Sequence, residues 1–227
     1  MNVSNNLTTI LTPLPSLTKE EFEIVVTRYN ESLDWLKPYE HLATVYNKGK
    51  DSCGIKSEIF LQNFGRGTEV MLRHIVNNYD KLAKVTFFSQ GQLADRSDQP
   101  LYPLTYYAQT PIDGVRGYAV EAWDLGKSRF RERLSGADCV SIGNKTLAQW
   151  RNDVVGISYQ PYKEKWVRGD WIAIGRDRVH RFPNSFYHKL YDATSFYRGE
   201  SIEEMWFWER TFWSLFTRDL DTPNPRA

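Results

Sequence analysis

Apolar residues in the first part of the chain fall into three short runs, each followed at once by polar residues. The runs are Phe22–Thr27, Leu42–Tyr46 and Val85–Phe88, and they are rich in β-branched and aromatic residues. Runs of this length and composition predict three strands.

Helix-like patterns separate these strands. A short helix around Trp35 is expected after the first strand, and Pro38 is expected to end it. Residues 50–63 are interpreted as a loop. Residues 69–78 have the amphipathic spacing of a helix, with Thr68 as its predicted N-cap. This alternation predicts a βαβαβ half-sheet with parallel strands and right-handed crossovers.

The second half of the chain has weaker patterns, and residues 92–136 show no clean period. Beyond them, the sequence predicts helices at Asn144–Asn152, Arg176–Arg181, Phe186–Ala193 and Ser201–Phe216, and a strand at Trp166–Ile174. Ser201 and Glu204 have the spacing of a capping box at the start of the last helix.

Together these elements predict a single α/β domain with a mostly parallel central sheet flanked by helices. The domain is expected to span residues 19–218, which is long enough for one substantial core. Residues 1–18, rich in Asn, Thr, Ser and Pro, are interpreted as a loose arm, and residues 219–227 as a tail.

Composition limits the classes of function. The 227 residues carry a net charge of +1, so bulk charge argues against a protein that coats nucleic acid. Aromatic residues make up 15% of the chain and include eight Trp. Such rings either build the core or provide stacking surfaces for the apolar faces of sugars, and both uses are compatible.

Cysteines and apolar runs bear on where the protein works. Cys53 and Cys139 are far apart and lack metal-ligand spacing, which fits a reducing cytoplasm and leaves one disulfide open. Met1–Leu17 has neither the basic start nor the uninterrupted apolar run of a signal peptide. No apolar run approaches the roughly 20 residues that cross a bilayer. The sequence therefore predicts a soluble cytoplasmic protein.

The polar residues that close the predicted strands are the main functional signal. They are Arg28–Glu31, Asn47–Gly49 and Ser89–Gly91, and a further group, Asn63–Arg66, opens the helix after the second strand. In open α/β sheets the ligand crevice lies beyond the carboxyl ends of the strands. These four segments are therefore expected to meet at one edge of the sheet and to bind a ligand there.

In this order the motifs resemble a family of small glycosyltransferase-like proteins, catalogued as a domain of unknown function and found in bacteria, fungi and large viruses. The residues that carry the resemblance are Arg28–Glu31, Trp35, Tyr46–Gly49, Asn63, Gly65, Arg66, His74, Ile75, Asn78–Asp80, Phe88, Gln90, Gly91, Glu209 and Arg210. The resemblance covers residues 22–216 and implies a compact nucleotide-sugar transferase of the GT-A kind.

One position departs from the family pattern. The family has a glutamate where this chain has Gly67, and Glu69 is the nearest acid. Either that glutamate has a direct role in the family, or it only favours the helix N-terminus, which Glu69 also does.

A transferase of this kind must neutralise the leaving diphosphate with a metal ion or with cationic side chains. The D-x-D that holds Mn²⁺ or Mg²⁺ in many GT-A enzymes does not follow a central strand here. Asp219 and Asp221 spell it in the tail, and Asp95 and Asp98 follow the third strand with the wrong spacing. The sequence favours metal-independent catalysis, with Mn²⁺ or Mg²⁺ kept as the alternative.

The donor site is therefore expected to use cations at strand ends and at a helix start. Arg28, Lys48 and Arg66 occupy such positions, although each also fits a solvated surface charge. Asn30 and Glu31 are expected to bind the base or ribose, or else to cap the following helix. The predicted donor set is Arg28, Tyr29, Asn30, Glu31, Lys48, Gly65, Arg66 and Gln90, and a UDP-sugar is the first candidate donor.

Glu209 is the predicted general base, because it lies among aromatic residues on the last helix. The alternative interpretation is an ion pair of Glu209 with Arg210 or another arginine. Trp171 and Trp208 are expected to stack on the acceptor, and Asp170 is a second candidate catalytic residue beside it.

The sequence thus predicts a glycosyltransferase that moves a hexose or pentose from a nucleotide-sugar to a glycan or polysaccharide acceptor. An inactive carbohydrate-binding protein on the same scaffold is the first alternative. A viral transferase that glycosylates modified DNA bases is the second, although phosphate contacts need a basic groove. His74, inside an amphipathic helix, is assigned a structural role.

Overall fold

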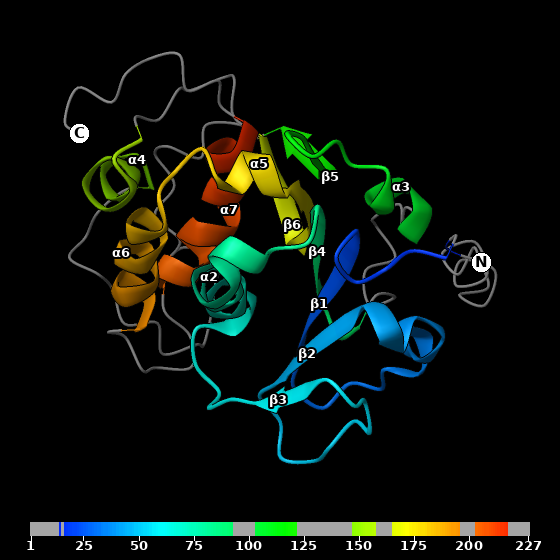
Figure 1. Cartoon of the computed structure of the whole chain (residues 1–227). Coiled ribbons are helices and arrows are strands. Elements are labelled where there is room, and N and C mark those ends of the chain that lie inside the picture. Colours follow the sequence, from blue (N-terminus) through cyan, green and yellow to red (C-terminus); the bar gives the residue numbers. More distant parts are fainter. Residues whose placement is uncertain are drawn as a thin grey trace.

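The structure of the chain, a computed structural model, describes residue 14 and residues 16–92, 103–121, 147–157, 165–195 and 203–217. Within these ranges, six strands form one sheet in the order β3-β2-β1-β4-β6-β5, with helices on both faces (Figure 1). The strands are β1 (Phe22–Arg28), β2 (Ala43–Asn47), β3 (Glu58–Phe60), β4 (Val85–Gln90), β5 (Val115–Glu121) and β6 (Lys165–Gly175). The predicted α/β class is confirmed.

The helical segments range from single turns to four turns. They are η1 (Asp34–Leu42), α2 (Arg66–Asn78), η2 (Tyr79–Lys81), α3 (Leu104–Ala108), α4 (Leu147–Trp150), η5 (Arg151–Val155), α5 (Arg176–Val179), α6 (Asn184–Ser195) and α7 (Glu203–Thr217). η1 is a 3₁₀ segment kinked at Tyr39, so Pro38 does not end it as expected. Proline is tolerated there because it lies at a break between two short turns.

The start of α2 also differs from the prediction. The helix begins at Arg66, its N-cap is Gly65, and Thr68 lies buried inside it. Thr68 as N-cap is therefore wrong. Gly65 has a left-handed conformation, which glycine adopts without steric cost, and no side chain caps this helix start.

The parallel half of the sheet follows the predicted order of elements. β1 pairs in parallel with β2 and with β4, which confirms the βαβαβ half-sheet. β3 pairs in parallel with β2 inside the segment 50–63, so the interpretation of that segment as a loop is wrong there. β3 has three residues, and its Ile59 and Phe60 are exposed, so it has no buried apolar run that a pattern could reveal.

The other half of the sheet is antiparallel. β6 confirms the strand predicted at Trp166–Ile174, but it runs antiparallel to both β4 and β5, so the sheet is mixed. β5 and α3 lie within residues 92–136. A register shift between Gly117 and Ala119 interrupts the pairing of β5, which accounts for the lack of a clean strand period in this part of the sequence.

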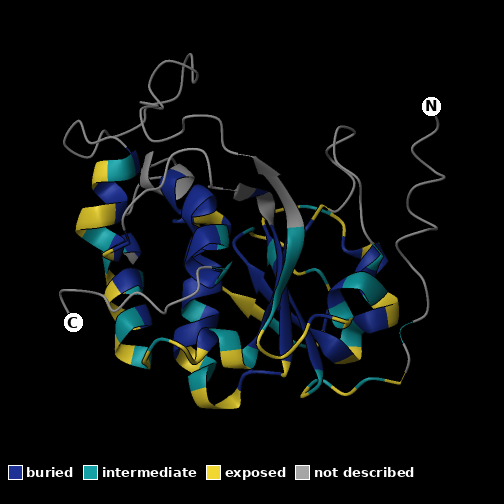
Figure 2. Ribbon diagram, turned by 90° about the horizontal axis from the view of Figure 1, so that it is seen from above, coloured by how far each residue is buried: buried dark blue, intermediate teal, exposed yellow. Residues whose placement is uncertain are grey.

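The two faces of the sheet carry separate apolar clusters, because side chains alternate along each strand. On β1, Val25 joins the cluster formed with α2, α6 and α7, whereas Ile24 and Val26 join the cluster formed with η1 and α3. On β6, Ile172 and Trp171 divide in the same way. Figure 2 shows the result, with buried strands between helices on two sides.

Large rings build much of this core. Trp35, Trp150, Trp171 and Trp208 are all buried. Trp150 meets Trp208 edge-on, with ring centroids 4.9 Å apart, which is a favourable aromatic geometry. Leu147 and Trp150 point inward, as the pattern of that helix predicts.

The ends of the predicted domain lie partly outside the described residues. Leu17 packs against the cluster formed with η1 and α3, so the chain meets the core before residue 19. The predicted tail 219–227 and the capping residue Ser201 fall outside the described ranges. Within those ranges, every helix is too short or too polar to cross a membrane.

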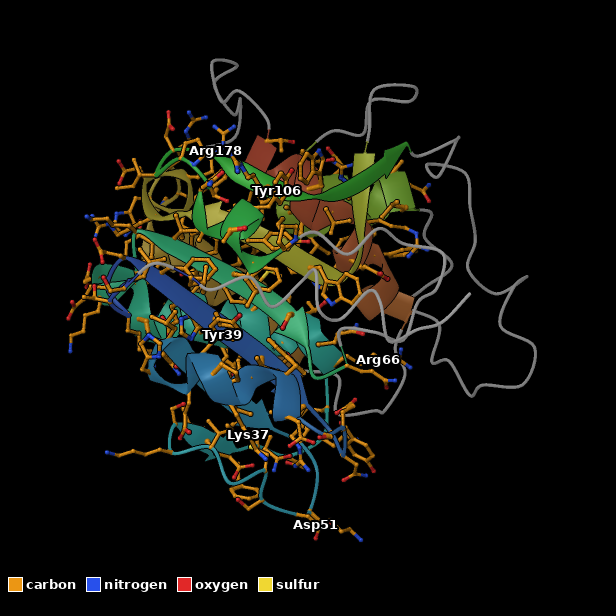
Figure 3. All side chains as sticks on the ribbon, turned by 90° about the vertical axis from the view of Figure 1, so that its right-hand side faces the viewer. Lys37, Tyr39, Asp51, Arg66, Tyr106 and Arg178 are labelled. Carbon is orange, nitrogen blue, oxygen red and sulfur yellow. The ribbon has the colours of Figure 1, made fainter. Side chains whose placement is uncertain are left out.

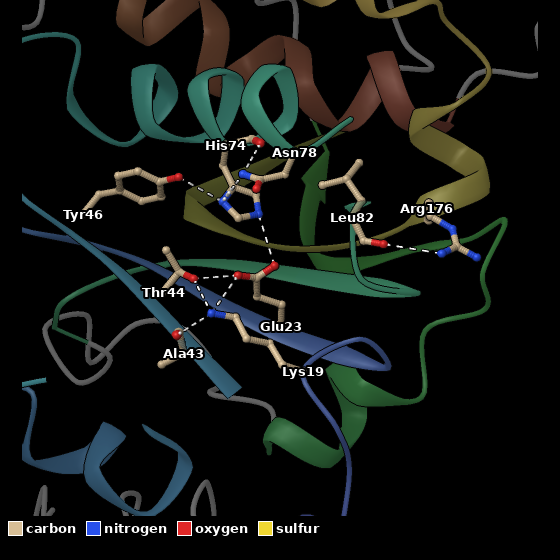
Figure 4. Close-up of polar contacts among 9 residues, drawn as sticks. All are labelled: Lys19, Glu23, Ala43, Thr44, Tyr46, His74, Asn78, Leu82 and Arg176. Carbon is tan, nitrogen blue, oxygen red and sulfur yellow. Dashed lines mark hydrogen bonds and ion pairs between the residues drawn. The ribbon is translucent and has the colours of Figure 1, made fainter. Parts of the chain in front are cut away.

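A buried polar network joins β1, β2 and α2 (Figure 4). Oε2 of Glu23 lies 3.3 Å from Nε2 of His74, and Oε1 accepts a 2.6 Å hydrogen bond from Thr44. The Tyr46 hydroxyl lies 3.1 Å from Nδ1 of His74, and Lys19 lies 3.4 Å from the Glu23 carboxylate. His74 is thus part of the core, consistent with the structural role assigned to it.

This network makes the stability of the fold depend on pH. Burial alone would raise the pKa of Glu23, but its contacts with His74, Thr44 and Lys19 outweigh burial and lower that pKa. Ionised Glu23 therefore stabilises the folded chain fully above the ordinary glutamate pKa of about 4.3. The stabilisation is lost as the pH falls through the lower folded value, because the unfolded chain takes up the proton first.

We predict that Glu23→Gln removes this part of the acid sensitivity. Urea unfolding measured from about pH 6 to about pH 3 should show a steeper loss of unfolding free energy in the wild type than in the variant. Glu20→Gln, which removes an exposed carboxylate nearby, should keep the wild-type slope. Parallel curves for the wild type and Glu23→Gln would contradict the prediction.

Candidate functional site

The four polar segments singled out in the sequence lie together at the carboxyl edge of the parallel strands. The backbone amide of Lys48 donates to the carbonyl of Arg28, and that of Gly91 donates to the carbonyl of Thr27, each over 2.8 Å. The ammonium of Lys48 donates to the carbonyl of Arg66 at the start of α2, over 2.6 Å. The ends of β1, β2 and β4 and the start of α2 are therefore in direct contact.

This edge is a point where the chain topology switches. The connection from β1 to β2 contains η1, which packs on one face of the sheet. The connection that leads to β4 contains α2, which packs on the other face. β2 and β4 therefore lie on opposite sides of β1, and open α/β sheets bind ligands at the carboxyl ends of strands at such a point.

The turn after β1 is fixed by its own side chains. The buried guanidinium of Arg28 donates to the carbonyls of Glu31, over 3.0 Å, and Asp51. The Glu31 carboxylate turns back and accepts from the amides of Tyr29, over 2.6 Å, and Asn30, over 3.1 Å. Arg28, predicted as a donor contact, is only 6% exposed and acts here as a brace between two loops.

Two glycines allow these segments to approach one another. A Cβ on Gly49 would lie 1.5 Å from the carbonyl oxygen of Tyr29, and a Cβ on Gly91 would lie 3.0 Å from the Glu31 carboxylate. The carbonyl of Gly91 also accepts a 2.8 Å hydrogen bond from the indole of Trp35. Any side chain at Gly49 would push the turn after β1 away from β2.

Lys48 is also turned inward. Its side chain is 2% exposed, and its ammonium contacts the carbonyls of Phe64 and Arg66 and lies 3.0 Å from the carboxylate of Glu69. A direct contact between Lys48 and a nucleotide-sugar would require these interactions to break.

The helix α2 begins with two consecutive residues in the left-handed region. φ is 66° at Gly65 and 49° at Arg66, and Arg66 is the one non-glycine residue with positive φ in the described ranges. Such conformations cost energy in a residue with a side chain, and they are concentrated at functional sites. The Arg66 side chain is exposed and projects from the ribbon (Figure 3).

The accessible surface of this edge comes from the predicted donor set. Tyr29 is 50% exposed, Asn30 and Arg66 are exposed, and Gln90 is partly exposed. We call these four residues the carboxyl-edge set. They offer an aromatic ring, two amides and a guanidinium, which can stack on a ring, hydrogen-bond and bind an anion.

Glu209 is the seventh of the 15 residues of α7 and therefore lies near the middle of that helix. The carbonyl of Thr217, at the end of α7, accepts a 3.2 Å hydrogen bond from Arg178 of α5. α5 follows β6, which runs antiparallel to β4, so this end of α7 lies at the amino edge. Glu209 precedes it by about two helical turns. The side chain of Glu209 is 10% exposed and lies 3.9 Å from Arg210, so the ion pair weighed as its alternative role is present.

The two rings predicted to bind the acceptor lie in the core. Trp208 is fully buried between Trp150 and Phe212, and Trp171 is 3% exposed in the cluster with η1 and α3. Neither ring offers a face to a sugar in this conformation. Both rings are part of the core, which is the other role that the sequence allows for the aromatic residues. Asp170 lies on β6, and its side chain is outside the described part of the structure.

A metal site was not favoured by the sequence. In the ranges that the structure describes, no group of three or more His, Cys, Asp or Glu residues is arranged to hold a metal ion. Asp95, Asp98, Asp219 and Asp221 fall outside those ranges, so metal independence stays a prediction.

Two hollows at the amino edge were missed by sequence reasoning. One, of about 310 Å³, is lined by the buried network, including Tyr46 and His74. The other, of about 720 Å³, lies between η1 and the start of β3 and is lined by Lys37 and Lys56. The sequence pattern pointed to polar residues that follow the strands, whereas these hollows are lined by residues that precede the strands or lie within them.

Comparison of the chain with protein-family models, with curated proteins and with solved structures finds no match. Function is therefore inferred from the site itself.

We predict that Gly65→Ala destabilises the chain more than Gly54→Ala. Both positions have positive φ, so both variants lose about 1–2 kcal/mol of unfolding free energy through backbone strain. A Cβ at Gly54 meets nothing within 4 Å, whereas one at Gly65 would lie 2.4 Å from Cβ of the buried Glu69. The added clash should cost a further ~1–3 kcal/mol. Equal losses in urea unfolding would show that the start of α2 relaxes freely.

Proposed function

We propose that the protein is a glycosyltransferase that works in the cytoplasm and transfers a sugar from a nucleotide-sugar, with a UDP-sugar as the first candidate, to a glycan acceptor. The observation that carries the proposal is the position of Arg66. It is an exposed cation in a strained conformation, at the start of α2 and in contact with Lys48 at the end of β2, on the carboxyl edge of the sheet.

The carboxyl-edge set supplies the groups that a nucleotide diphosphate needs. Arg66 neutralises the diphosphate as negative charge develops on it during sugar transfer. Tyr29 provides a ring for stacking, and the amides of Asn30 and Gln90 can hydrogen-bond the base or ribose. Arg28, Lys48 and Glu31 hold the segments that carry these side chains, through hydrogen bonds to backbone groups.

Glu209 is proposed as the general base of an inverting transfer. Its carboxylate takes the proton from the acceptor hydroxyl, the acceptor oxygen bonds to the anomeric carbon, and the bond from that carbon to the diphosphate oxygen breaks. The nucleoside diphosphate leaves with the bonding electron pair. The low exposure of Glu209, among the buried aromatic residues Phe207, Trp208 and Phe212 of α7, supports this role.

The carbohydrate-binding alternative has less support. It depends on several exposed aromatic platforms, whereas Trp171 and Trp208 are buried and Tyr29 is the exposed ring of the carboxyl-edge set, beside a cation that a neutral glycan does not need. The DNA-glycosylating alternative depends on a basic groove, and the net charge of +1 does not favour one.

We predict that a nucleotide-sugar stabilises the wild type against heat and that Arg66→Ala abolishes this effect. Thermal unfolding is measured with UDP-, GDP-, CMP- and dTDP-sugars, each in EDTA and in Mn²⁺. At a donor concentration near one hundred times Kd, one nucleotide class in EDTA should raise Tm by about 5–10 °C.

Arg181→Ala is the matched control, because Arg181 is an exposed arginine just after α5 at the amino edge and should leave the shift intact. A shift only in Mn²⁺ would overturn metal independence. No shift with any donor would contradict the transferase proposal.

We predict that Glu209→Gln lowers kcat by about 10²–10⁴-fold without weakening donor binding, because the amide cannot accept the acceptor proton. Arg210→Gln is the control, since it breaks the same ion pair but keeps the carboxylate. Equal losses of kcat in both variants would show that the pair acts on structure and not on proton transfer.

A further inference from the structure

We propose that Lys48 is a positioning residue that sets the place of Arg66 relative to the turn after β1, and that it does not contact the donor. The inference rests on the proposed function, in which Arg66 binds the diphosphate. The position of Lys48 directly after β2 suggests that it binds the nucleotide-sugar, and the role proposed here is different.

The ammonium of Lys48 is turned into the protein, away from a ligand at the surface, because its side chain is only 2% exposed. An ammonium carries three N–H groups. The Nζ atom lies 2.5 Å from the carbonyl oxygen of Phe64, 2.6 Å from that of Arg66 and 3.0 Å from Oε2 of Glu69. The ammonium therefore donates to two carbonyls and forms an ion pair with the carboxylate, and the two carbonyls flank Gly65 in the left-handed turn that opens α2.

The carboxylate of Glu69 is held equally firmly. It is fully buried, and its Oε1 accepts a 2.5 Å hydrogen bond from Nε of Arg73 on the same helix. The hydroxyl of Tyr191 on α6 donates to the same oxygen over 3.4 Å. The partner of Lys48 is thus fixed to the body of α2 and to the neighbouring helix.

The backbone of Lys48 is tied to the other half of the site. Its amide donates to the carbonyl of Arg28 over 2.8 Å, at the start of the turn that carries Tyr29 and Asn30. The next residue, Gly49, lies against the carbonyl of Tyr29. One residue therefore links the turn after β1, through its backbone, to the start of α2, through its side chain.

The strained conformation of Arg66 needs such a link. Its positive φ is unfavourable for a residue with a Cβ, and surrounding contacts must hold it. The ammonium of Lys48 binds the Arg66 carbonyl and so resists relaxation of the turn. A buried ion pair adds little net stability compared with well-packed apolar residues, so its main effect here is on geometry.

The test uses the pair variant Lys48→Met with Glu69→Gln. Lys48→Met alone would leave a buried carboxylate without its ammonium, whereas the pair variant removes both charges. The amide oxygen introduced by Glu69→Gln can still accept the hydrogen bond from Arg73. UDP is the probe, and its Kd and the Tm of each protein are measured.

The pair variant should keep a Tm close to that of the wild type and bind UDP about tenfold more weakly or worse, as Arg66→Ala does. Adding Arg66→Ala to the pair variant should weaken UDP binding no further, because Lys48 acts through Arg66. Wild-type affinity in the pair variant would overturn the proposal. Additive losses would also overturn it, because they would mean that Lys48 contacts UDP by itself.

Amide hydrogen exchange separates this inference from the proposed function, because it needs no ligand. Residues 64–67 should exchange faster in the pair variant, while residues 70–76 of α2 keep wild-type protection. Failure of the wild type to bind UDP would count against UDP as the donor nucleotide of the proposed function, and unchanged exchange at residues 64–67 would count against the positioning role.

If the pair variant does not fold, Lys48→Arg replaces it. This change keeps the charge beside Glu69, but a planar guanidinium cannot donate to the carbonyls of Phe64 and Arg66 in the same geometry. Faster exchange at residues 64–67 and weaker UDP binding are expected, and wild-type values for both would overturn the proposal.

Discussion

Parallel pairing of β1 with β2 on one side and with β4 on the other is the constraint on which the rest of the structure depends. It brings the ends of three strands to one edge, and it places η1 and α2 on opposite faces. Because those ends are close-packed, several of the residues after them are glycine or turn inward, as Gly49, Gly91 and Lys48 do. The side chains of the carboxyl-edge set remain accessible beside them.

The predicted site divides into a frame and a surface. Arg28, Lys48 and Glu31 form the frame and bind backbone groups of neighbouring segments, whereas Tyr29 and Arg66 face solvent. The buried cations cost desolvation free energy, which their hydrogen bonds and ion pairs offset. A frame of this kind restricts the motion of the exposed groups, and preorganised groups bind a charged transition state more effectively than mobile ones.

Sequence patterns predicted β1, β2 and β4 because those strands bury short continuous apolar runs, and they predicted the last helix from the capping-box spacing at its start. They missed β3, which buries little, and could not give the direction of β6, because strand direction leaves no periodic signal. Polar residues after strands pointed to segments that do meet at one edge of the sheet. The same reasoning could not show that Lys48 is buried and Arg66 exposed, because the burial of Lys48 depends on contacts with Glu69 and Phe64, which are distant in the sequence. It also could not show that Trp208 lies in the core.

The most direct test of a ligand site at the carboxyl edge is amide hydrogen exchange of the whole chain with and without UDP, in EDTA. Protection is expected in residues 28–31, 48–49, 64–67 and 90–91, with residues 40–44 and 78–84 at the amino edge unchanged. Protection confined to the amino edge, where the two hollows lie, or no protection anywhere, would contradict a UDP site at the carboxyl edge.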